Sequence, residues 1–443
     1  MERNAYNARL GRRNREKRRR VKCVSNSFMK SCAHEEGFVK LRQWMTQNYG
    51  FRNCLVPALF PETGRGLMTK RAIKSGEIIV SLPHSLLITT KTVLDSEIGH
   101  VIKRWKPKLS PQQCLSIFLI WERNKHTSST WFPYINLLPS SFTTPAYFSQ
   151  TELTYLPTAV RSKAVKECEK LEDTFNEVKQ FSMKHWNEFY KMLTSDVYRW
   201  AWYVINTRSV FYQSGQSEYL STEEPDTIAL APFLDLLNHS PAANIKAGFN
   251  PVNKSYEIIT NDTYKAYDQV FISYGCHGNQ KLFLEYGFCV PDNPDDEFEV
   301  MLYNLVILLF FSEDIVKACK HFAVEHLSKK MELLQEHGLL KSLMCTKEGL
   351  SWKLLTVFKT LAMDWNQLQC WNQVFTDEAA FTEVLPAANN MASYILQQYL
   401  TENTQLMKYV EQTVSSTDNP EHVDIARQLI YIEKHILTAS LPS

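Results

Sequence analysis

Apolar and polar positions alternate along the chain with two different periods. Phe38, Leu41 and Met45 recur at helical spacing and Gly50 follows them as a stop signal, which predicts a helix after position 35. Between 55 and 90 the pattern changes to short apolar runs separated by glycines, which predicts strands and turns, including a tight turn at 64–67. From 91 to about 215 the helical period returns, so a helical block interrupts a β-rich region.

Short strand patterns reappear at 228–230, 256–260 and 270–274. Apolar-periodic stretches then continue to the end of the chain and predict further helices, at 298–311, 314–336, 351–366, 386–411 and 419–437. The fold class expected is therefore α+β, with a β-rich region, a helical insertion and an all-helical C-terminal domain. We expect a tail over 1–33, a first domain over 34–290 with its insertion at about 91–215, and a second domain over 291–443.

The charge is unevenly distributed. The 443 residues carry a net charge of +2, but residues 1–22 hold ten basic and two acidic side chains and the remainder is mildly acidic. Three interpretations of this basic segment stay open: a nuclear localisation signal, a contact to nucleic-acid phosphates, or a solubilising tail. Nucleus and cytoplasm are the expected compartments.

Several classes of protein are excluded by spacing. The ten cysteines are never closer than nine residues, so they form no C-x-x-C zinc or redox pair, and no metal site is expected. The longest uninterrupted apolar run is far shorter than the roughly 18 residues of a membrane span, so no membrane partner is expected. Phosphate-binding glycine loops and the serine-nucleophile elbow are also missing.

The informative motifs stand in a fixed order. Gly64, Gly66 and Leu67 belong to the first, Asp235, Asn238 and His239 to the second, and Tyr274, Tyr286 and Phe288 to the third. Each is weak alone, because an Asn-His-Ser segment can be an ordinary turn and a tyrosine an ordinary core residue.

In this order the motifs resemble the split-SET protein methyltransferases typified by the Rubisco large-subunit methyltransferases. The resemblance covers about 35–440. It implies a SET fold interrupted by a helical insertion, S-adenosyl-L-methionine as cofactor and a protein substrate. It also implies cofactor contacts in three regions, which include Gly64, Gly66, Leu67, Glu97, Ile98, Gly99, Arg208, Asp235, Asn238, His239, Tyr274 and Phe288.

The same resemblance assigns Tyr274, Tyr286 and Tyr256 to catalysis, as tyrosines around the transferred methyl group and the substrate amine. Methyl transfer depends on alignment more than on an acid or base. A lysine with pKa of about 10.4 must first lose a proton, and an aromatic channel lowers that pKa by desolvation, so no dedicated base is needed. Tyr256 fits a core tyrosine equally well.

A protein-lysine methyltransferase acting on histone or non-histone proteins is therefore the expected function. Histidine methylation is the close alternative, although apolar Val210 stands where that branch has a polar residue. A catalytically silent peptide-binding scaffold is a second alternative, and a nucleic-acid binder led by the basic tail is a third.

Overall fold

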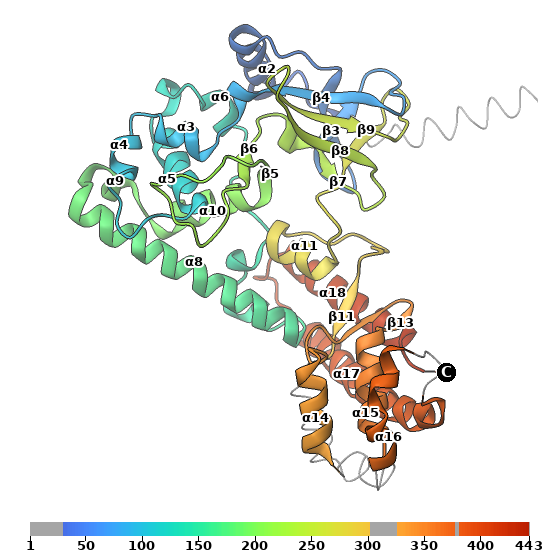
Figure 1. Cartoon of the computed structure of the whole chain (residues 1–443). Coiled ribbons are helices and arrows are strands. Elements are labelled where there is room, and N and C mark those ends of the chain that lie inside the picture. Colours follow the sequence, from blue (N-terminus) through green and yellow to red (C-terminus); the bar gives the residue numbers. More distant parts are fainter. Residues whose placement is uncertain (1–29, 302–325, 377–380, 443) are drawn as a thin grey trace, which may run out of the picture. The chain divides into compact units, whose positions relative to one another are not determined.

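The structure is a computed structural model that describes residues 30–301, 326–376 and 381–442. The chain divides into two compact units (Figure 1). Of the described residues, the first contains 30–142 and 169–276, and the second contains 143–168 and those that follow 276. Both units are therefore discontinuous in sequence. The domain limits expected from the sequence stay a prediction.

The first unit contains small sheets whose strands come from distant parts of the sequence. One has the order β1-β2-β3-β10-β7, and its strands are Lys30–Ser31, Leu55–Phe60, Gly64–Thr69, Gln269–Ile272 and Asn238–His239. Another has the order β4-β9-β8, with strands Glu77–Pro83, Ser255–Thr260 and Ile245–Asn250. A third pairs β5 with β6, Ser209–Phe211 and Ile228–Leu230. The strands expected at 228–230, 256–260 and 270–274 are thus confirmed, the last ending at Ile272.

The expected lead-in helix is also confirmed. Helix α2 spans Glu36–Tyr49 and buries Phe38, Leu41 and Met45, and it ends at Gly50, whose φ of 65° is the left-handed conformation of a helix C-cap. The helical block follows as expected, with α3, α4, α5, α6, α8, α9 and α10 at Thr90–Leu94, Gly99–Ile102, Pro111–Asn124, Phe132–Ile135, Thr158–His185, Asn187–Met192 and Ser195–Arg208.

Helices α5 and α10 pack against each other in the first unit. Most side chains of α5 are buried, and in α10 the run Trp200–Ile205 is buried as well. Such helices, apolar on most faces, belong in the interior of a domain. They form the rigid support from which Arg208, at the C-terminal end of α10, projects.

The second unit is mainly helical. Its helices α7, α11, α14, α15, α16, α17 and α18 span Gln150–Leu153, Asn279–Tyr286, Leu327–Glu336, Trp352–Ala362, Trp365–Gln369, Leu385–Thr413 and Pro420–Ala439. The predictions at 351–366, 386–411 and 419–437 are confirmed, and much of 298–311 and 314–336 lies outside the described residues. The unit also contains a three-stranded sheet that the sequence did not predict, formed by β11, β12 and β13 at Glu297–Glu299, Met344–Thr346 and Gly349–Leu350.

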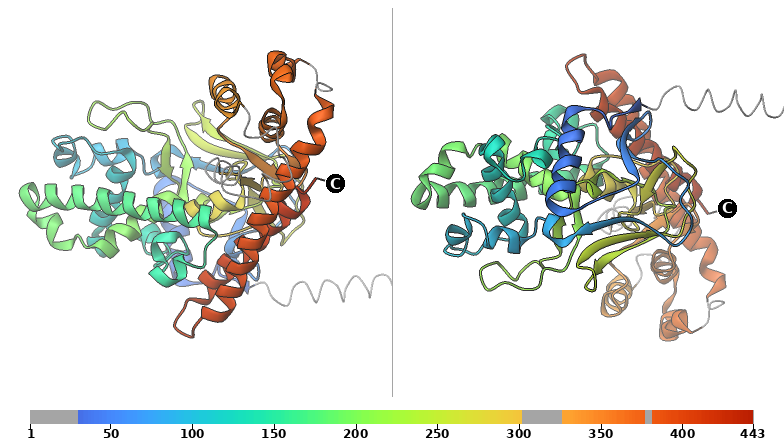
Figure 2. Two further views of the ribbon diagram at one scale, coloured as in Figure 1. Left: turned by 90° about the horizontal axis from the view of Figure 1, so that it is seen from below. Right: turned by 90° about the horizontal axis from the view of Figure 1, so that it is seen from above.

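The long helices α17 and α18 lie side by side (Figures 1 and 2). A buried carboxylate fixes the start of α18 to the segment around α7. Glu152 accepts hydrogen bonds from the backbone N–H groups of Ser149 and Asn419, each at 2.7 Å, and its Oε2 lies 3.1 Å from Nδ1 of His422. Burial alone would raise the pKa of Glu152, but these groups together hold it below its usual value of 4.5.

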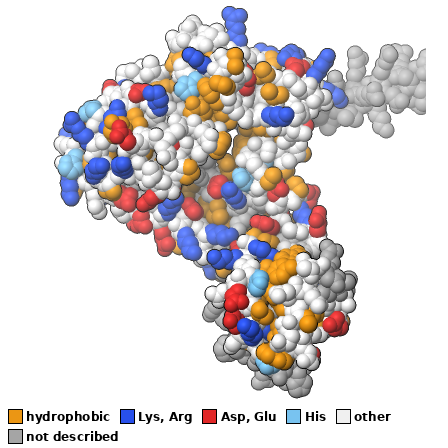
Figure 3. All heavy atoms as spheres, viewed as in Figure 1, with side chains coloured by type: hydrophobic (Ala, Val, Ile, Leu, Met, Phe, Trp, Pro, Cys, Tyr) orange, Lys and Arg blue, Asp and Glu red, His pale blue; other side chains and the backbone are white. Residues whose placement is uncertain are grey.

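Two surface properties bear on function. None of the helices in the described parts of the chain is long and apolar enough to cross a membrane. Basic and acidic side chains are interspersed over the face drawn in Figure 3.

Candidate active site

The site begins at the entry to β3. Gly64 has a φ of 67°, and the turn precedes it, so Gly66 and Leu67 lie in the strand and not in a tight turn as expected. A Cβ on Gly66 would stand 2.6 Å from Oε1 of Gln269 and 2.7 Å from Nδ2 of Asn238. Any larger residue here would force the Gln269 and Asn238 side chains to shift, so glycine permits their close approach to β3.

Asn238 holds this entry in place. Its Nδ2 group donates to Oε1 of Gln269 at 2.9 Å and to the carbonyl of Arg65 at 3.1 Å. Because Gln269 begins β10 and Arg65 lies in β3, one amide connects three strands that are far apart in sequence. The predicted site residues Gly66 and Asn238 are therefore brought together.

His239 lies in β7, and Tyr274 follows the end of the neighbouring strand β10. Strands β7 and β10 run parallel, with Ile272 opposite His239. The backbone N–H of Tyr274 donates to Nδ1 of His239 at 3.1 Å, and the Tyr274 hydroxyl donates to the carbonyl of Leu237 at 2.8 Å. Accepting at Nδ1 requires the imidazole proton to be on Nε2. Tyr274 is thus held at both its backbone and its hydroxyl.

A buried ion pair lies at the end of α10. Nη1 of Arg208 donates to Oδ2 of Asp235 and to the Asp235 carbonyl, both at 3.1 Å, and the Tyr134 hydroxyl donates to the same Oδ2 at 3.0 Å. Burial raises the pKa of Asp235 despite the attraction of Arg208, and it raises that of Tyr134 well above the usual value. Burial also lowers the pKa of Arg65, which Arg208 lowers further by repulsion.

The segment 97–99 has other partners. The carboxylate of Glu97 accepts from Nε1 of Trp121 at 2.5 Å and from Nζ of Lys125 at 2.9 Å. Ile98 is buried, and a Cβ on Gly99 would lie 2.1 Å from the carbonyl of Leu94, so a local backbone contact explains this glycine. Within the described part of the chain, no hydrogen bond or ion pair joins Glu97 to the groups around Arg208 or Asn238. The cofactor roles of 97–99 stay predictions.

Tyr256 belongs to the first unit and lies in the central strand β9, opposite Leu82 in β4 and Phe249 in β8. It is 4% exposed, and burial raises the pKa of its phenol. A phenol in this state keeps its proton at neutral pH and remains a hydrogen-bond donor.

Tyr286 and Phe288 belong to the second unit. Tyr286 is the last residue of α11, and the helix ends at Gly287, whose φ is 81° and whose N–H donates to the carbonyls of Leu282 and Phe283. The Tyr286 and Phe288 rings lie 6.2 Å apart. Burial, and then repulsion from Glu285, raise the pKa of Tyr286 to about 12.

Three further residues join the site without having been predicted for it. Tyr134 donates to Asp235, Arg65 supplies a backbone acceptor and a nearby positive charge, and Gln269 accepts from Asn238. Tyr134 stands in an apolar run whose pattern is that of core. Its hydrogen bond to Asp235, which is 101 residues further along the chain, arises from tertiary packing that local sequence patterns do not show.

Comparison with known proteins shows to which class of protein the chain belongs. Residues 64–275 match the family described as the SET domain. A solved structure described as the SET domain of LSMT bound to lysine and AdoHcy superposes with a TM-score of 0.62 at 19% identity, covering 91% of this chain and 90% of that one. At that identity the likeness shows the fold, which is the SET fold expected from the sequence.

Proteins found by sequence comparison are more similar to this chain than that solved structure is. SET domain-containing protein 4 of Homo sapiens is 34% identical over 404 residues, which cover 90% of this chain and 89% of that protein. Actin-histidine N-methyltransferase of Gallus gallus is 28% identical over 286 residues, 60% of this chain and 45% of that protein. The chain belongs to the SET-domain methyltransferases, in the family of SET domain-containing protein 4. Its cofactor is accordingly S-adenosylmethionine, which when bound supplies a methyl group on a positively charged sulfur.

The residues present fit this cofactor. Nε of Arg208 and Oδ1 of Asp235 are buried and have no hydrogen-bond partner among the residues that the structure describes. Buried polar groups are rarely left so, which points to a polar ligand beside them. Arg208, Asp235, Asn238 and His239 would hold the cofactor.

Proposed function

We propose that this protein is a protein-lysine N-methyltransferase. One observation carries the proposal: Tyr274 is fixed through its N–H and its hydroxyl to the strand that bears Asn238 and His239. A tyrosine oxygen and a main-chain carbonyl held at fixed positions can make weak C–H···O contacts that favour a polarised methyl group. The rate then comes mainly from alignment.

The substrate amine needs no dedicated base in this proposal. Near neutral pH, removing its proton costs about 3 pH units or roughly 4 kcal/mol, which desolvation beside tyrosine rings reduces. Tyr256, with its buried phenol, suits the amine by cation–π and hydrogen-bond contacts. Tyr286 and Phe288 lie in the second unit. By the family resemblance, Tyr286 is a tyrosine near the substrate amine and Phe288 is a cofactor contact.

Lysine is favoured over histidine as the acceptor by two points. Val210 stands where the histidine branch has a polar residue. It lies in β5 opposite Ala229, so this place in the sheet is apolar on both strands. This chain is also more similar to the human SET domain-containing protein 4 than to the chicken actin-histidine N-methyltransferase, and the match to the former covers more of both chains. The relationship to the latter keeps histidine methylation as the second candidate.

The test uses labelled cofactor and a protein extract. We expect incorporation by the wild type, loss of most of it in Tyr274→Phe and Asn238→Ala, and full activity in the control Tyr267→Phe, whose ring is 58% exposed. Mass spectrometry then identifies the modified side chain. No incorporation, or incorporation unchanged in Tyr274→Phe, would contradict the proposal, and methylhistidine alone would establish the second candidate. A silent scaffold would bind peptides but not S-adenosylhomocysteine in a calorimetric titration.

We further propose that histone or non-histone proteins are the substrates, and that residues 1–22 direct the protein to the nucleus in addition to the cytoplasm. The basic residues at 12–13 and 18–20 support the import proposal. Replacing Arg18, Arg19 and Arg20 with alanine in a fluorescent fusion should shift the protein to the cytoplasm. If that segment instead binds nucleic acid, deleting 1–22 should abolish a steeply salt-dependent affinity for DNA.

A further inference from the structure

Arg65 carries a positive charge that its neighbours do not balance. Its side chain is partly buried at the start of β3, and its Nη1 donates to the carbonyl of Leu137 at 3.2 Å. Among the residues that the structure describes, Arg65 has no other hydrogen-bond acceptor, and no carboxylate lies within ion-pair distance of it. A guanidinium has five N–H donors, so most of them are available to another group.

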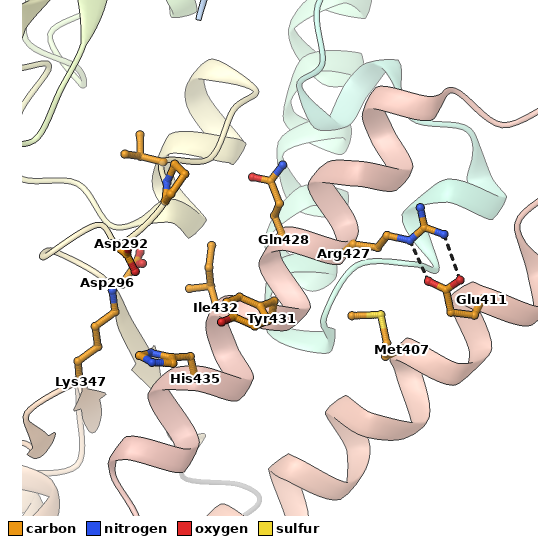
Figure 4. Close-up of a pocket in the computed structure, with 12 residues that line it drawn as sticks. Asp292, Asp296, Lys347, Met407, Glu411, Arg427, Gln428, Tyr431, Ile432 and His435 are labelled. Atoms are coloured by element: carbon orange, nitrogen blue, oxygen red, sulfur yellow. Dashed lines mark hydrogen bonds and ion pairs between the residues drawn. The ribbon is translucent and has the colours of Figure 1, made fainter. Parts of the chain in front are cut away.

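Arg427 in the second unit shows the ordinary state of such a side chain. It lines a cavity of about 640 Å³, and it donates to both carboxylate oxygens of Glu411, at 2.9 and 3.2 Å (Figure 4). Two parallel hydrogen bonds of this kind match the planar fork of a guanidinium and cancel most of its charge. Arg65 has no such partner in the described part of the chain.

The charges around Arg65 leave a positive excess. Arg208 repels Arg65 and Asp235 attracts it, and these two groups have the largest charge effects on the Arg65 pKa. Asp235 already pairs with Arg208 at 3.1 Å, so its one charge does not balance both guanidiniums. Glu35 attracts Arg65 more weakly and is exposed, and burial raises the pKa of the Cys32 thiol, which is therefore uncharged at neutral pH. An anion close to both arginines would be stabilised.

The same place holds two buried polar atoms that lack a partner. Nε of Arg208 and Oδ1 of Asp235 form no hydrogen bond within the described residues, although the Asp235 side chain is only 2% exposed. The first is a donor and the second an acceptor, so a ligand that satisfies both offers an acceptor and a donor close together. The α-amino acid group of S-adenosylmethionine does so through its carboxylate and its ammonium.

We propose that Arg65 is a specificity residue for the cofactor, whose guanidinium binds the α-carboxylate of S-adenosylmethionine together with Arg208. An anion that accepts from both side chains offsets the repulsion between them, and hydrogen bonds between arginine and a carboxylate are among the strong ones in proteins. The inference deepens the proposed function, because it rests on the cofactor, and it holds whether lysine or histidine is methylated.

A purely structural role for Arg65 predicts a different result. Leu137 lies two residues beyond α6, and basic side chains often bind the carbonyls at the end of a helix. If Arg65 only fixed this carbonyl, its loss would weaken the binding of every cofactor analogue to the same extent. Two ligands that differ only in the carboxylate therefore separate the two roles.

The test is a calorimetric titration of the full chain with S-adenosylhomocysteine and with its decarboxylated analogue, which keeps the adenosine, the thioether and the amine. We expect the wild type to bind S-adenosylhomocysteine at least about tenfold tighter than the analogue. Arg65→Met should weaken S-adenosylhomocysteine binding by about tenfold or more and change the affinity for the analogue by less than about threefold. Equal weakening of both ligands, or unchanged S-adenosylhomocysteine binding, would overturn the inference.

Two further variants keep the test decisive. Arg65→Lys retains the charge without the planar fork, so it should fold like the wild type and show a smaller loss that again affects S-adenosylhomocysteine alone. The control Arg71→Met removes an arginine just after β3 whose side chain is 53% exposed and pairs with Glu77, and it should leave both affinities unchanged. A wild type that fails to bind S-adenosylhomocysteine would overturn the proposed function as well, whereas equal losses for the two ligands overturn this inference alone.

Discussion

Replacing Glu152 with glutamine should destabilise the second unit. The carboxylate offers acceptors to two backbone N–H groups at 2.7 Å and to His422, and its side chain is 6% exposed. Glutamine keeps one acceptor oxygen and turns an NH₂ group toward the other contact. One buried backbone N–H group then has no acceptor, which costs about 1–3 kcal/mol, and a hydrogen bond to a charged acceptor, worth about 1.5–3 kcal/mol, is lost. We expect a total of about 3 kcal/mol.

Urea unfolding of the full chain, with amide exchange of α18 as a local readout, measures this loss. At roughly 2–4 °C per kcal/mol it corresponds to a fall in Tm of about 6–12 °C. The matched control Glu411→Gln removes the surface pair with Arg427 and should cost at most about 1 kcal/mol.

The pH dependence gives a second check. Since the folded-state pKa of Glu152 is lowered, its stabilisation is present above about pH 4.5 and is lost as the pH falls through the folded-state value. The difference between wild type and Glu152→Gln should therefore shrink from pH 6 to pH 3. A loss below about 1 kcal/mol at pH 7, or a difference that stays constant with pH, would refute the reasoning.

Three further predictions concern the site. Gly287→Ala should cost about 2–4 kcal/mol in urea unfolding, since φ is 81° and a Cβ would lie 2.8 Å from a neighbouring hydroxyl, whereas Gly248→Ala, with open space around it, should be nearly neutral. Arg208→Met should cost about 3 kcal/mol in urea unfolding, because it leaves the Asp235 carboxylate buried without its ion-pair partner, whereas Lys91→Met, which breaks an exposed pair with Asp95, should cost at most about 1 kcal/mol; equal losses would contradict this. Initial rates should not fall between pH 8 and 10, because Tyr286, with a pKa of about 12, stays protonated.

Local features of the fold could be predicted from the sequence. The apolar face of α2 and its glycine stop depend only on neighbouring residues, so periodicity and one turn signal were sufficient. The small β11–β13 sheet was missed because two- and three-residue strands are too short to show a period. The turn was predicted at 64–67 but precedes Gly64, because a glycine indicates a bend without showing which residues form it.

The candidate site could be predicted only through the order of its motifs. Nothing in the sequence places Tyr134 beside Asp235, or Gln269 beside Asn238, because these contacts arise from tertiary packing. The resemblance assigned Asn238, His239 and Tyr274 to one site, and the structure brings them together, yet the resemblance gave no sign that the Asn238 amide hydrogen-bonds to the start of β3. Glu97 illustrates the limit, since its hydrogen bonds are to Trp121 and Lys125.

The pairing of β3 with β10 has a consequence for synthesis on the ribosome. Met68 pairs with Gln269, so the central strand waits for a partner made about 200 residues later, which at roughly 5–20 residues per second takes about 10–40 s. Asn238, His239 and Tyr274 also emerge late. The nascent chain therefore exposes an open strand edge for nearly half of its elongation, and any pause before residue 269 prolongs the interval in which that edge can pair wrongly.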